Sequence, residues 1–259
     1  MTTWKGAVFE LHAVVSGTPT LHFEAWKQAF EEALSDIEEG RHDRSLDYER
    51  DYLPYIHGRP RYVAVRTVLE SRDIHLPNGH PSDAPERLTV CGIANRKNEL
   101  FRTLLSEQGV RPADAALERI AEFRDAGIAT ALVSSSRNCR AVLASAGLLE
   151  YFDVVIDGAD VMELSLPVRP EPDAFELAAE NLGVVPGQCL LAEAAPEGVE
   201  AGRRGSFGLV VGVSRDGNED RLHESGADMI VSGVGALSTD AVQSWFAEGR
   251  EEDAWLVSY

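Results

Sequence analysis

The sequence has few cysteines and no long apolar run, and both shortages exclude classes of protein. Its three cysteines, Cys91, Cys139 and Cys189, are scattered without CxxC spacing. This usage is typical of a reduced, cytoplasmic protein, in which we expect the thiols to be buried as small apolar groups. No apolar run approaches the roughly 18 residues that a membrane-spanning helix needs. The opening residues also lack the basic and apolar regions of a signal peptide, so we predict a cytoplasmic location.

Basic residues are scarce as well. The chain carries 24 lysines and arginines against 43 aspartates and glutamates, which gives a formal net charge of −19. Such a surface repels the phosphates of nucleic acids and of anionic lipids, so we expect neither nucleic acid nor a membrane as a partner. A small anionic ligand would need a local basic pocket inside this negative field.

The pattern of apolar residues predicts an α/β protein, built as one large domain or as a core with an insert. The predicted strands are Gly6–Leu11, Thr130–Ser134, Phe152–Asp157, Cys189–Ala192, Gly208–Val213 and Met229–Val231. After residue 130 the predicted helices are Asn138–Ala146, Asp173–Leu182, Gly198–Arg204 and Thr239–Phe246. Residues 20–110 carry only helical patterns, at Leu21–Leu34, Tyr62–Ser71 and Lys97–Gln108. The order predicts a parallel sheet with a helical block inserted after its first strand.

In open α/β sheets the ligand binds at the C-terminal ends of the strands. Here those ends are Glu10–Ala13, Ser134–Ser136 and Glu193–Ala194. We therefore expect the chemistry of this protein at these three segments.

Several segments resemble the motifs of one known family and occur in that family's order. The first four are FELHAVVSGTPTLHFEAW (Phe9–Trp26), VSSSRNCRAVL (Val133–Leu143), RPEPDAF (Arg169–Phe175) and EAAPEGVEAG (Glu193–Gly202). Two more lie in the insert, GRPRYVAVRTVL (Gly58–Leu69) and NRKNEL (Asn95–Leu100). Together they resemble the haloacid dehalogenase (HAD) superfamily, and within it the β-phosphoglucomutase-like proteins. The resemblance implies a Rossmann-like parallel-sheet core at 1–17 and 112–259, with an inserted helical cap domain at 18–111.

The residues that would carry phosphoryl transfer in this family are altered. The family's first motif holds two aspartates, of which the first attacks phosphorus and the second moves a proton; here those positions hold Glu10 and His12. Glutamate is one methylene longer, and a misplacement of about 1 Å can slow such a reaction by roughly 100-fold. His12 can still carry a proton, since its unperturbed pKa is about 6.5. We therefore predict Glu10 and His12 as a catalytic acid–base pair.

The metal site implied by the resemblance is altered too. The family's fourth motif supplies acidic magnesium ligands, whereas here Glu193 is followed by Ala194. Glu10, Glu193 and a backbone carbonyl near His12 would supply only part of the near-octahedral oxygen shell of magnesium. We expect no required cofactor, and at best weak magnesium binding at Glu10 and Glu193. An alternative is a transition-metal site made by these two carboxylates and His12.

Groups that would hold an anionic, sugar-like ligand are partly kept. Arg169 stands where the family has a lysine, and its guanidinium would pair with an anion or bridge Glu10 and Glu193. Ser134 matches the phosphate-binding residue of the second motif. The other residues expected to bind substrate are Ser135, Arg137 and Asn138 in the core, and His22, Arg61, Lys97 and Asn98 in the insert. For His22, Arg61 and Lys97 the alternative is a role in packing or at the surface.

Three functions fit these residues. The first is a repurposed enzyme that binds a small anionic or polar metabolite, phosphorylated or not, and uses Glu10 and His12 for isomerase, lyase or cyclase chemistry. The second is a non-catalytic protein that binds a ligand or a partner. The third is a residual magnesium-dependent phosphatase or sugar-phosphate mutase with Glu10 as nucleophile. Fold analogy does not separate them, because function depends on the site.

Overall fold

The structure is a computed structural model that describes residues 3–35, 45–56, 59–215, 217–248 and 257–258. The chain divides into two compact units. The first, called the core unit here, consists of Met1–Ser16 and Val110–Tyr259. The second, called the helical unit, is Gly17–Gly109. Gly58, the first residue of one family motif, lies outside the described residues.

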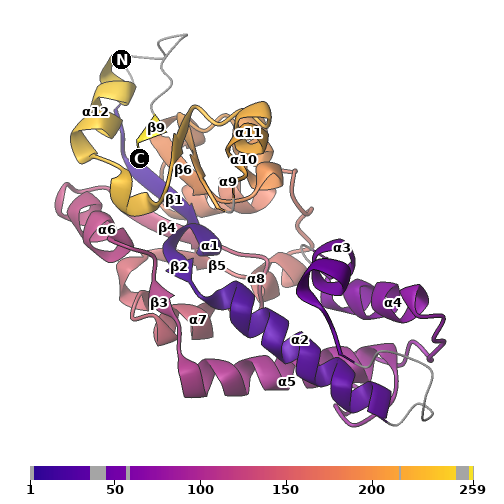
Figure 1. Ribbon diagram of the computed structural model, residues 1–259. Helices are drawn as coiled ribbons and strands as arrows, with labels where there is room; N and C mark the ends of the chain where they lie inside the picture. Colours follow the sequence, from indigo (N-terminus) through magenta and orange to yellow (C-terminus); the bar gives the residue numbers. More distant parts are fainter. Residues whose placement is uncertain (1–2, 36–44, 57–58, 216, 249–256, 259) are drawn as a thin grey trace. The chain divides into compact units, whose positions relative to one another are not determined.

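A parallel sheet forms the centre of the core unit, as the sequence predicts (Figure 1). Its strand order is β5–β4–β1–β6–β7–β8–β9. The strands are β1 (Gly6–Glu10), β4 (Ala129–Val133), β5 (Val154–Ile156), β6 (Cys189–Glu193), β7 (Leu209–Val213), β8 (Met229–Val231) and β9 (Val257–Ser258). Glu10 pairs with Val133, and Phe9 pairs with Ala192. This register brings the C-terminal ends of β1, β4 and β6 to the same edge of the sheet.

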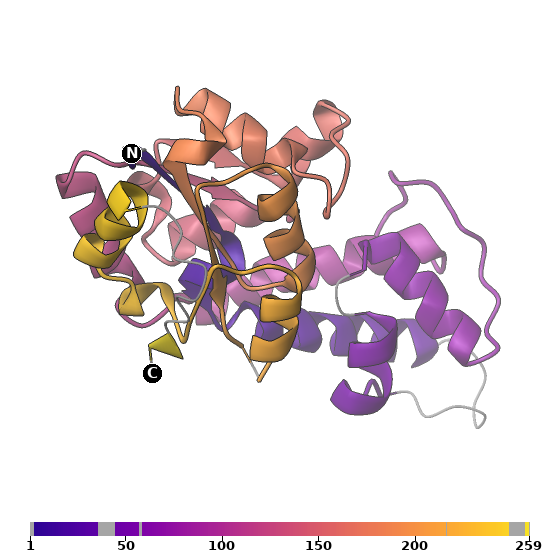
Figure 2. The same ribbon diagram turned by 90° about the horizontal axis from the view of Figure 1, so that it is seen from above.

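Helices cover both faces of this sheet (Figure 2). The helices α6 (Ala116–Asp125) and α12 (Thr239–Glu248) lie on one face, where Phe123 and Phe246 both pack against Trp4. The opposite face carries α9 (Asp173–Asn181), α10 (Pro196–Arg204) and α11 (Glu219–Glu224). Successive side chains of β1 alternate between the faces, so Phe9 stacks on Phe123 and Val8 joins the cluster under α9 and α10. Every residue of β1 is buried, as expected for a central strand.

Shorter elements complete the core unit. They are α1 (Leu11–Val14), α7 (Cys139–Ser145), α8 (Gly158–Glu163) and three 3₁₀ turns at Leu149–Tyr151, Pro186–Gln188 and Val234–Ala236. A second small sheet pairs β2 (Val15–Ser16) with β3 (Arg111–Pro112) in antiparallel fashion. Because Ser16 lies opposite Arg111, the chain leaves the core unit and returns to it at adjoining positions.

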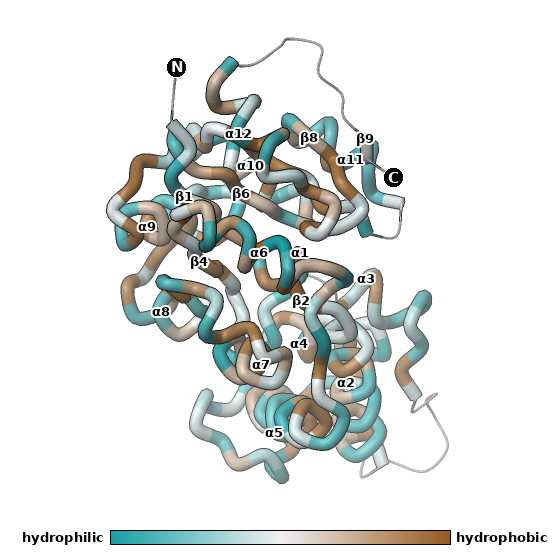
Figure 3. Tube along the Cα trace, turned by 90° about the vertical axis from the view of Figure 1, so that its left-hand side faces the viewer, coloured by the Kyte–Doolittle hydropathy of each residue, from teal (hydrophilic) through white to brown (hydrophobic). Residues whose placement is uncertain are grey.

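The helical unit is built on the contact between two long helices, α2 (Thr18–Ser35) and α5 (Val90–Gln108). The other helices of this unit are α3 (Leu53–Tyr55), α4 (Arg61–Ser71) and a π-helical turn at Tyr48–Tyr52. The tube of α5 has both hydrophilic and hydrophobic stretches (Figure 3), and after Ala94 its buried residues, Lys97, Leu100, Phe101 and Leu105, recur with the helical period. The apolar cluster of the helical unit joins the start of α5 to Trp26 and Phe30 from α2 and to Val65 from α4.

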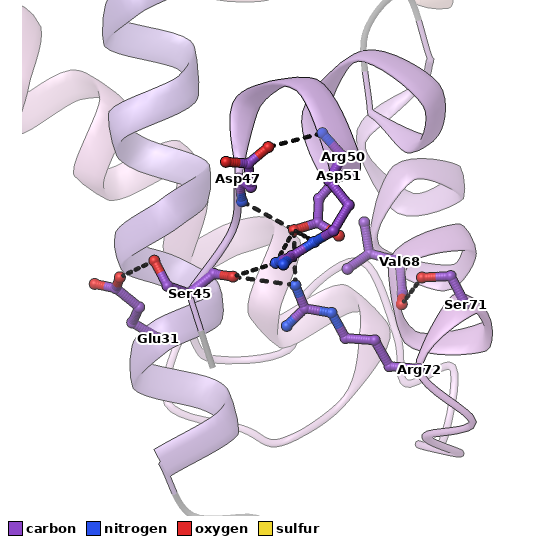
Figure 4. Close-up of polar contacts among 8 residues, drawn as sticks. All are labelled: Glu31, Ser45, Asp47, Arg50, Asp51, Val68, Ser71 and Arg72. Carbon is purple, nitrogen blue, oxygen red and sulfur yellow. Dashed lines mark hydrogen bonds and ion pairs between the residues drawn. The ribbon is translucent and has the colours of Figure 1, made fainter. Parts of the chain in front are cut away.

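The buried carboxylate of Asp51 connects the segment before α3 to the end of α4 by hydrogen bonds. Oδ2 of Asp51 accepts hydrogen bonds from the Asp47 backbone and from the guanidiniums of Arg50 and Arg72 (Figure 4). Both arginines also donate to the carbonyl of Ser45. The charge of Asp51 is therefore compensated within the helical unit, which is the condition for burying it.

The structure shows where the predicted boundaries were wrong. The helix predicted to begin at Lys97 begins at Val90, where Oγ1 of Thr89 accepts a hydrogen bond from the Gly92 backbone. The sequence between Val90 and Ala94 is apolar on every side, so it shows no one-sided helical period. The helices α6, α8 and α11 were also missed.

All three cysteines are buried free thiols, as predicted. Among the described residues, no helix is long and apolar enough to cross a membrane.

Candidate functional site

Glu10 ends β1 at the edge of the sheet that the sequence indicates for chemistry. It is 2% exposed, and it caps the short helix α1 by accepting a hydrogen bond from the His12 backbone at Oε2 (2.7 Å). Its other oxygen, Oε1, lies 3.1 Å from Nδ1 of His12. Both carboxylate oxygens of Glu10 therefore contact His12, which makes the two residues a single hydrogen-bonded unit.

Glu10 and His12 shift each other's pKa. Burial by itself raises the pKa of Glu10, but the charge and hydrogen bonds of His12, together with the charge of Arg169, outweigh it and hold that pKa below its usual range. The Glu10 carboxylate in turn raises the pKa of His12. His12 is thus favoured as a proton-carrying imidazolium beside an ionised carboxylate, with its side chain 43% exposed and open to solvent.

Glu193 ends β6 and has no solvent-exposed surface. Its Oε2 accepts a hydrogen bond from Nη1 of Arg169 at 2.6 Å. Its Oε1 accepts two more from the backbone N–H groups of Ala194 and Ala195, at 2.8 and 2.9 Å. Burial raises the pKa of the Glu193 carboxyl, while Arg169 opposes that shift. Of the two roles predicted for Arg169, the structure shows an ion pair with Glu193.

Two residues after β7, Arg215 and Asn218, complete this edge, and the sequence analysis did not single them out. Nη2 of Arg215 donates to the backbone carbonyl of His12 at 3.0 Å. The Asn218 side chain accepts from the Arg215 backbone N–H (2.8 Å) and donates to the carbonyl of Ala194 (3.0 Å). They belong to no family motif. The one available signal was position, since they follow a strand whose C-terminal end lies on the same edge of the sheet.

The residues present do not fit the magnesium ion that the resemblance implies. Both oxygens of Glu10 contact His12, and both oxygens of Glu193 already accept hydrogen bonds. Ala194 has no ligand atom in its side chain, and the carbonyl of His12 accepts a hydrogen bond from Arg215. Magnesium needs about six oxygens in near-octahedral order. Nor do the described residues include any group of three His, Cys, Asp or Glu side chains that could hold a metal ion.

The loop after β4 places only one of its predicted ligand-binding residues in the interior. Ser134 is 3% exposed, and its Oγ accepts a hydrogen bond from the Ser136 backbone. Ser135 and Arg137 are exposed, whereas Asn138 is half-buried directly before α7. Since Glu10 pairs with Val133, Ser134 follows at the same edge of the sheet as Glu10.

The helical unit holds a separate group of basic side chains from three helices. Nζ of Lys97 on α5 lies 2.6 Å from Nδ1 of His22 on α2. The Lys97 ammonium also lies over the rings of Trp26 and Phe101, at 5.2 and 5.0 Å from their centroids. Lys97 is 7% exposed, and burial, followed by the charge of Arg61, lowers its pKa to about 7. Within the described part of the chain, Lys97 contacts no carboxylate.

Arg61 begins α4, and its guanidinium donates to the hydroxyl of Tyr62 at 2.9 Å. Asn98 follows Lys97 on α5 and is half-buried. The structure thus gathers His22, Arg61 and Lys97 in one part of the helical unit, although they are far apart in the sequence.

Comparison with known proteins identifies the family. A family model described as haloacid dehalogenase-like hydrolase matches residues 11–205. The chain belongs to the haloacid dehalogenase-like hydrolases. This match spans both units, and it starts one residue after Glu10.

Similar proteins place this HAD-like chain in the β-phosphoglucomutase-like subfamily. The β-phosphoglucomutases of Mycobacterium bovis and Mycobacterium tuberculosis are 36% identical to it over 238 residues, which is 90% of this chain and 91% of theirs. The fructose-1-phosphate phosphatase of Escherichia coli is 25% identical over 207 residues, 80% of this chain and 95% of its own. A crystal structure of the Clostridium difficile β-phosphoglucomutase matches in fold, with a TM-score of 0.69 and 22% identity over 95% of this chain and 98% of that one.

Proposed function

We propose that this HAD-like protein acts on a small phosphorylated, sugar-like metabolite, with Glu10 and His12 as an acid–base pair instead of a phosphoenzyme. The hydrogen-bonded unit of Glu10 and His12 carries this proposal. The reaction would be an isomerisation, an elimination or a cyclisation, each of which needs a proton taken from one atom and returned to another.

The contacts of Glu10 favour proton transfer over attack on phosphorus. A nucleophilic carboxylate needs an oxygen free to approach phosphorus in line, but both oxygens of Glu10 are hydrogen-bonded to His12. The raised pKa of His12 makes it a proton donor near neutral pH, and the lowered pKa of Glu10 keeps that carboxyl ionised, so that Glu10 accepts a proton through its hydrogen bond with His12. The lack of fit for magnesium agrees with this assignment, because phosphoryl transfer depends on cations that neutralise the transferred group.

The basic group in the helical unit supports a phosphorylated substrate. His22, Arg61 and Lys97 come together in a chain whose net charge is −19. A local excess of positive charge in such a field is what an anionic ligand requires. The relatives named above are a sugar-phosphate mutase and a sugar-phosphate phosphatase, which favours the same class of ligand.

Phosphotransfer remains the second candidate, because family membership favours it. In a phosphotransfer reaction, the Glu10 carboxylate would first break its hydrogen bonds with His12 and then attack phosphorus. This reaction would need an added divalent cation.

The test follows a panel of sugar phosphates by phosphorus NMR, which detects both released phosphate and rearranged phosphate esters. Wild type, Glu10→Gln and His12→Asn are compared with magnesium and with a chelator. The exposed Glu150 supplies the matched control Glu150→Gln. We expect turnover that survives the chelator and falls by roughly 100-fold or more in both site variants but not in the control.

The other outcomes separate the candidates. Magnesium-dependent phosphate release that is lost in Glu10→Gln but kept in His12→Asn would establish phosphotransfer and reject the acid–base proposal. Binding of a sugar phosphate without any turnover, unchanged in His12→Asn, would make the chain a non-catalytic binding protein.

A further inference from the structure

The edge of the sheet in the core unit carries two guanidinium groups where the family resemblance implies a divalent cation. We propose that Arg169 and Arg215 replace that cation and make this edge a metal-independent binding site for an oxyanion such as phosphate. The inference uses the site of the proposed function, but it does not depend on proton transfer by Glu10 and His12.

The first step concerns Arg169. Glu193 is the surviving acidic residue of the fourth motif, and it is fully buried with Nη1 of Arg169 at 2.6 Å. A buried carboxylate requires a positive partner, and in this protein the partner is a side chain. A cation that competed for Glu193 would have to displace a charge-assisted hydrogen bond, which is among the stronger polar contacts in proteins.

The second step concerns Arg215. It donates to the carbonyl of His12, the backbone group expected to take part in a magnesium shell. Asn218 holds the Arg215 backbone and also binds the carbonyl of Ala194, so the end of β7 is connected to the ends of β1 and β6. The guanidinium of Arg215 is therefore anchored at this edge.

The third step concerns the donors that remain. Each guanidinium has five N–H donors in a planar fork that matches the oxygens of a phosphate. Within the described part of the chain, Arg169 and Arg215 each donate from a single nitrogen, Nη1 and Nη2 respectively. Arg169 keeps 27% of its side chain exposed, and Arg215 is half-buried. The remaining donors are available to an oxyanion that approaches from solvent.

The fourth step is the local charge. Three carboxylates, Glu10, Glu193 and Glu197, lie near three basic groups, Arg169, Arg215 and His12. The two buried carboxylates, Glu10 and Glu193, therefore have basic partners without a metal ion.

Direct binding measurements on the full chain test the proposal. Manganese serves as the metal probe, because its free aqueous ion is counted by electron paramagnetic resonance, and inorganic phosphate serves as the anion probe in calorimetry with a chelator present. We expect wild type to bind phosphate without metal and to show no manganese site tighter than about 1 mM. A tighter manganese site, or phosphate binding that requires a divalent cation, would overturn the proposal.

A set of variants assigns the effect to Arg215. Arg215→Gln should weaken phosphate binding by roughly tenfold, the usual effect of losing one charged hydrogen bond. The exposed Arg221 on α11 gives the matched control Arg221→Gln, with the same charge change and no expected effect. Equal phosphate affinity in Arg215→Gln and wild type would reject the role of Arg215.

The converse test restores the acidic residue that the family's fourth motif has at position 194. Ala194→Asp alone should not acquire a magnesium site, since Arg169 still pairs with Glu193 and Arg215 still binds the His12 carbonyl. Ala194→Asp combined with Arg169→Gln and Arg215→Gln should acquire one, seen as a rise in Tm of about 3 °C or more at saturating magnesium. Equal magnesium stabilisation of the single and triple variants would show that the two arginines do not replace the cation. If the triple variant does not fold, the wild-type and Arg215→Gln titrations still decide the question.

Discussion

Among single residues, Glu193 illustrates how a buried charge depends on its partner. Replacing Arg169 by Met would leave the carboxylate with only its two backbone donors and no opposite charge. We expect Arg169→Met to lower the free energy of unfolding by roughly 2–3 kcal/mol, somewhat less than for a fully buried pair because Arg169 is 27% exposed. The loss should shrink as pH falls through the raised pKa of Glu193, because the protonated acid needs no partner.

Urea unfolding at several pH values measures this effect. Arg204→Met removes exposed ion pairs with Glu171 and Glu200 and is the control, with an expected change below about 1 kcal/mol. Recovery of stability in Arg169→Met combined with Glu193→Gln would confirm the cause. A pH-independent loss would point to lost packing instead.

Lys97 gives the opposite case, a buried base that lies near His22 and Arg61 without a carboxylate contact among the described residues. Its pKa is about 7 in the folded protein, against about 10.4 for a solvated lysine. Between these values the unfolded chain binds the proton that the folded chain has released. Stability should therefore rise with pH, by at most roughly 1.4 kcal/mol per pH unit between about pH 7 and pH 10.

Lys97→Met should remove this slope and increase the free energy of unfolding most at pH 7 and below, where the folded protein must otherwise bury an ammonium. Thermal and urea unfolding from pH 6 to pH 10 would detect it. Lys5→Met, at an exposed position before β1, is the control. An unchanged slope in Lys97→Met would refute the assignment of the lowered pKa to Lys97.

At the scale of elements, α10 approaches β6 closely because its contact face carries glycine. A Cβ at Gly198 would overlap the Glu193 carboxyl, and one at Gly202 would meet the side chain of Leu191. Glu193 is fully buried and held by three hydrogen bonds, which a displaced carboxyl would lose. Gly198→Ala should therefore destabilise the protein by about 1–2 kcal/mol, although alanine favours a helix by roughly 1 kcal/mol.

Thermal unfolding of Gly198→Ala tests this contact, with Gly233→Ala as the control because no atom lies within 4 Å of a Cβ at that position. If Gly198→Ala is as stable as wild type, the helix has shifted away from β6. The proposed phosphate site should then change with it, which the calorimetric titration would show.

At the scale of the whole molecule, each of the two units has an apolar cluster of its own. Because Ser16 lies opposite Arg111 in the β2–β3 pair, a two-residue Asn-Gly turn can join them. We expect a chain in which this turn replaces residues 17–110 to fold and to unfold cooperatively in urea. Non-cooperative unfolding together with binding of a hydrophobic dye would show that the core unit needs the helical unit to fold.

The amount that could be predicted differs between the fold and the site. Strands such as Cys189–Glu193 were found because buried parallel strands are continuous apolar runs, and α4 and α9 because their apolar faces repeat with the helical period. The predicted start of α5 lies seven residues too late, since its first residues, Val90–Ala94, are buried on all sides and show no such period. Short helices such as α8 depend on tertiary packing and caps rather than on their own propensity.

The sequence by itself determined the family, the α/β class and the residues at each motif position, because these depend on local pattern and on the order of the chain. It indicated that Glu10, His12, Arg169 and Glu193 belong to one site, but it did not indicate which of them form hydrogen bonds or ion pairs. The tertiary structure decided that Glu10 contacts His12 with both oxygens, that Arg169 pairs with Glu193, and that Arg215 binds the His12 carbonyl. Arg215 lies 203 positions from His12 in the chain, and only the parallel order of the sheet brings their strand ends to one edge.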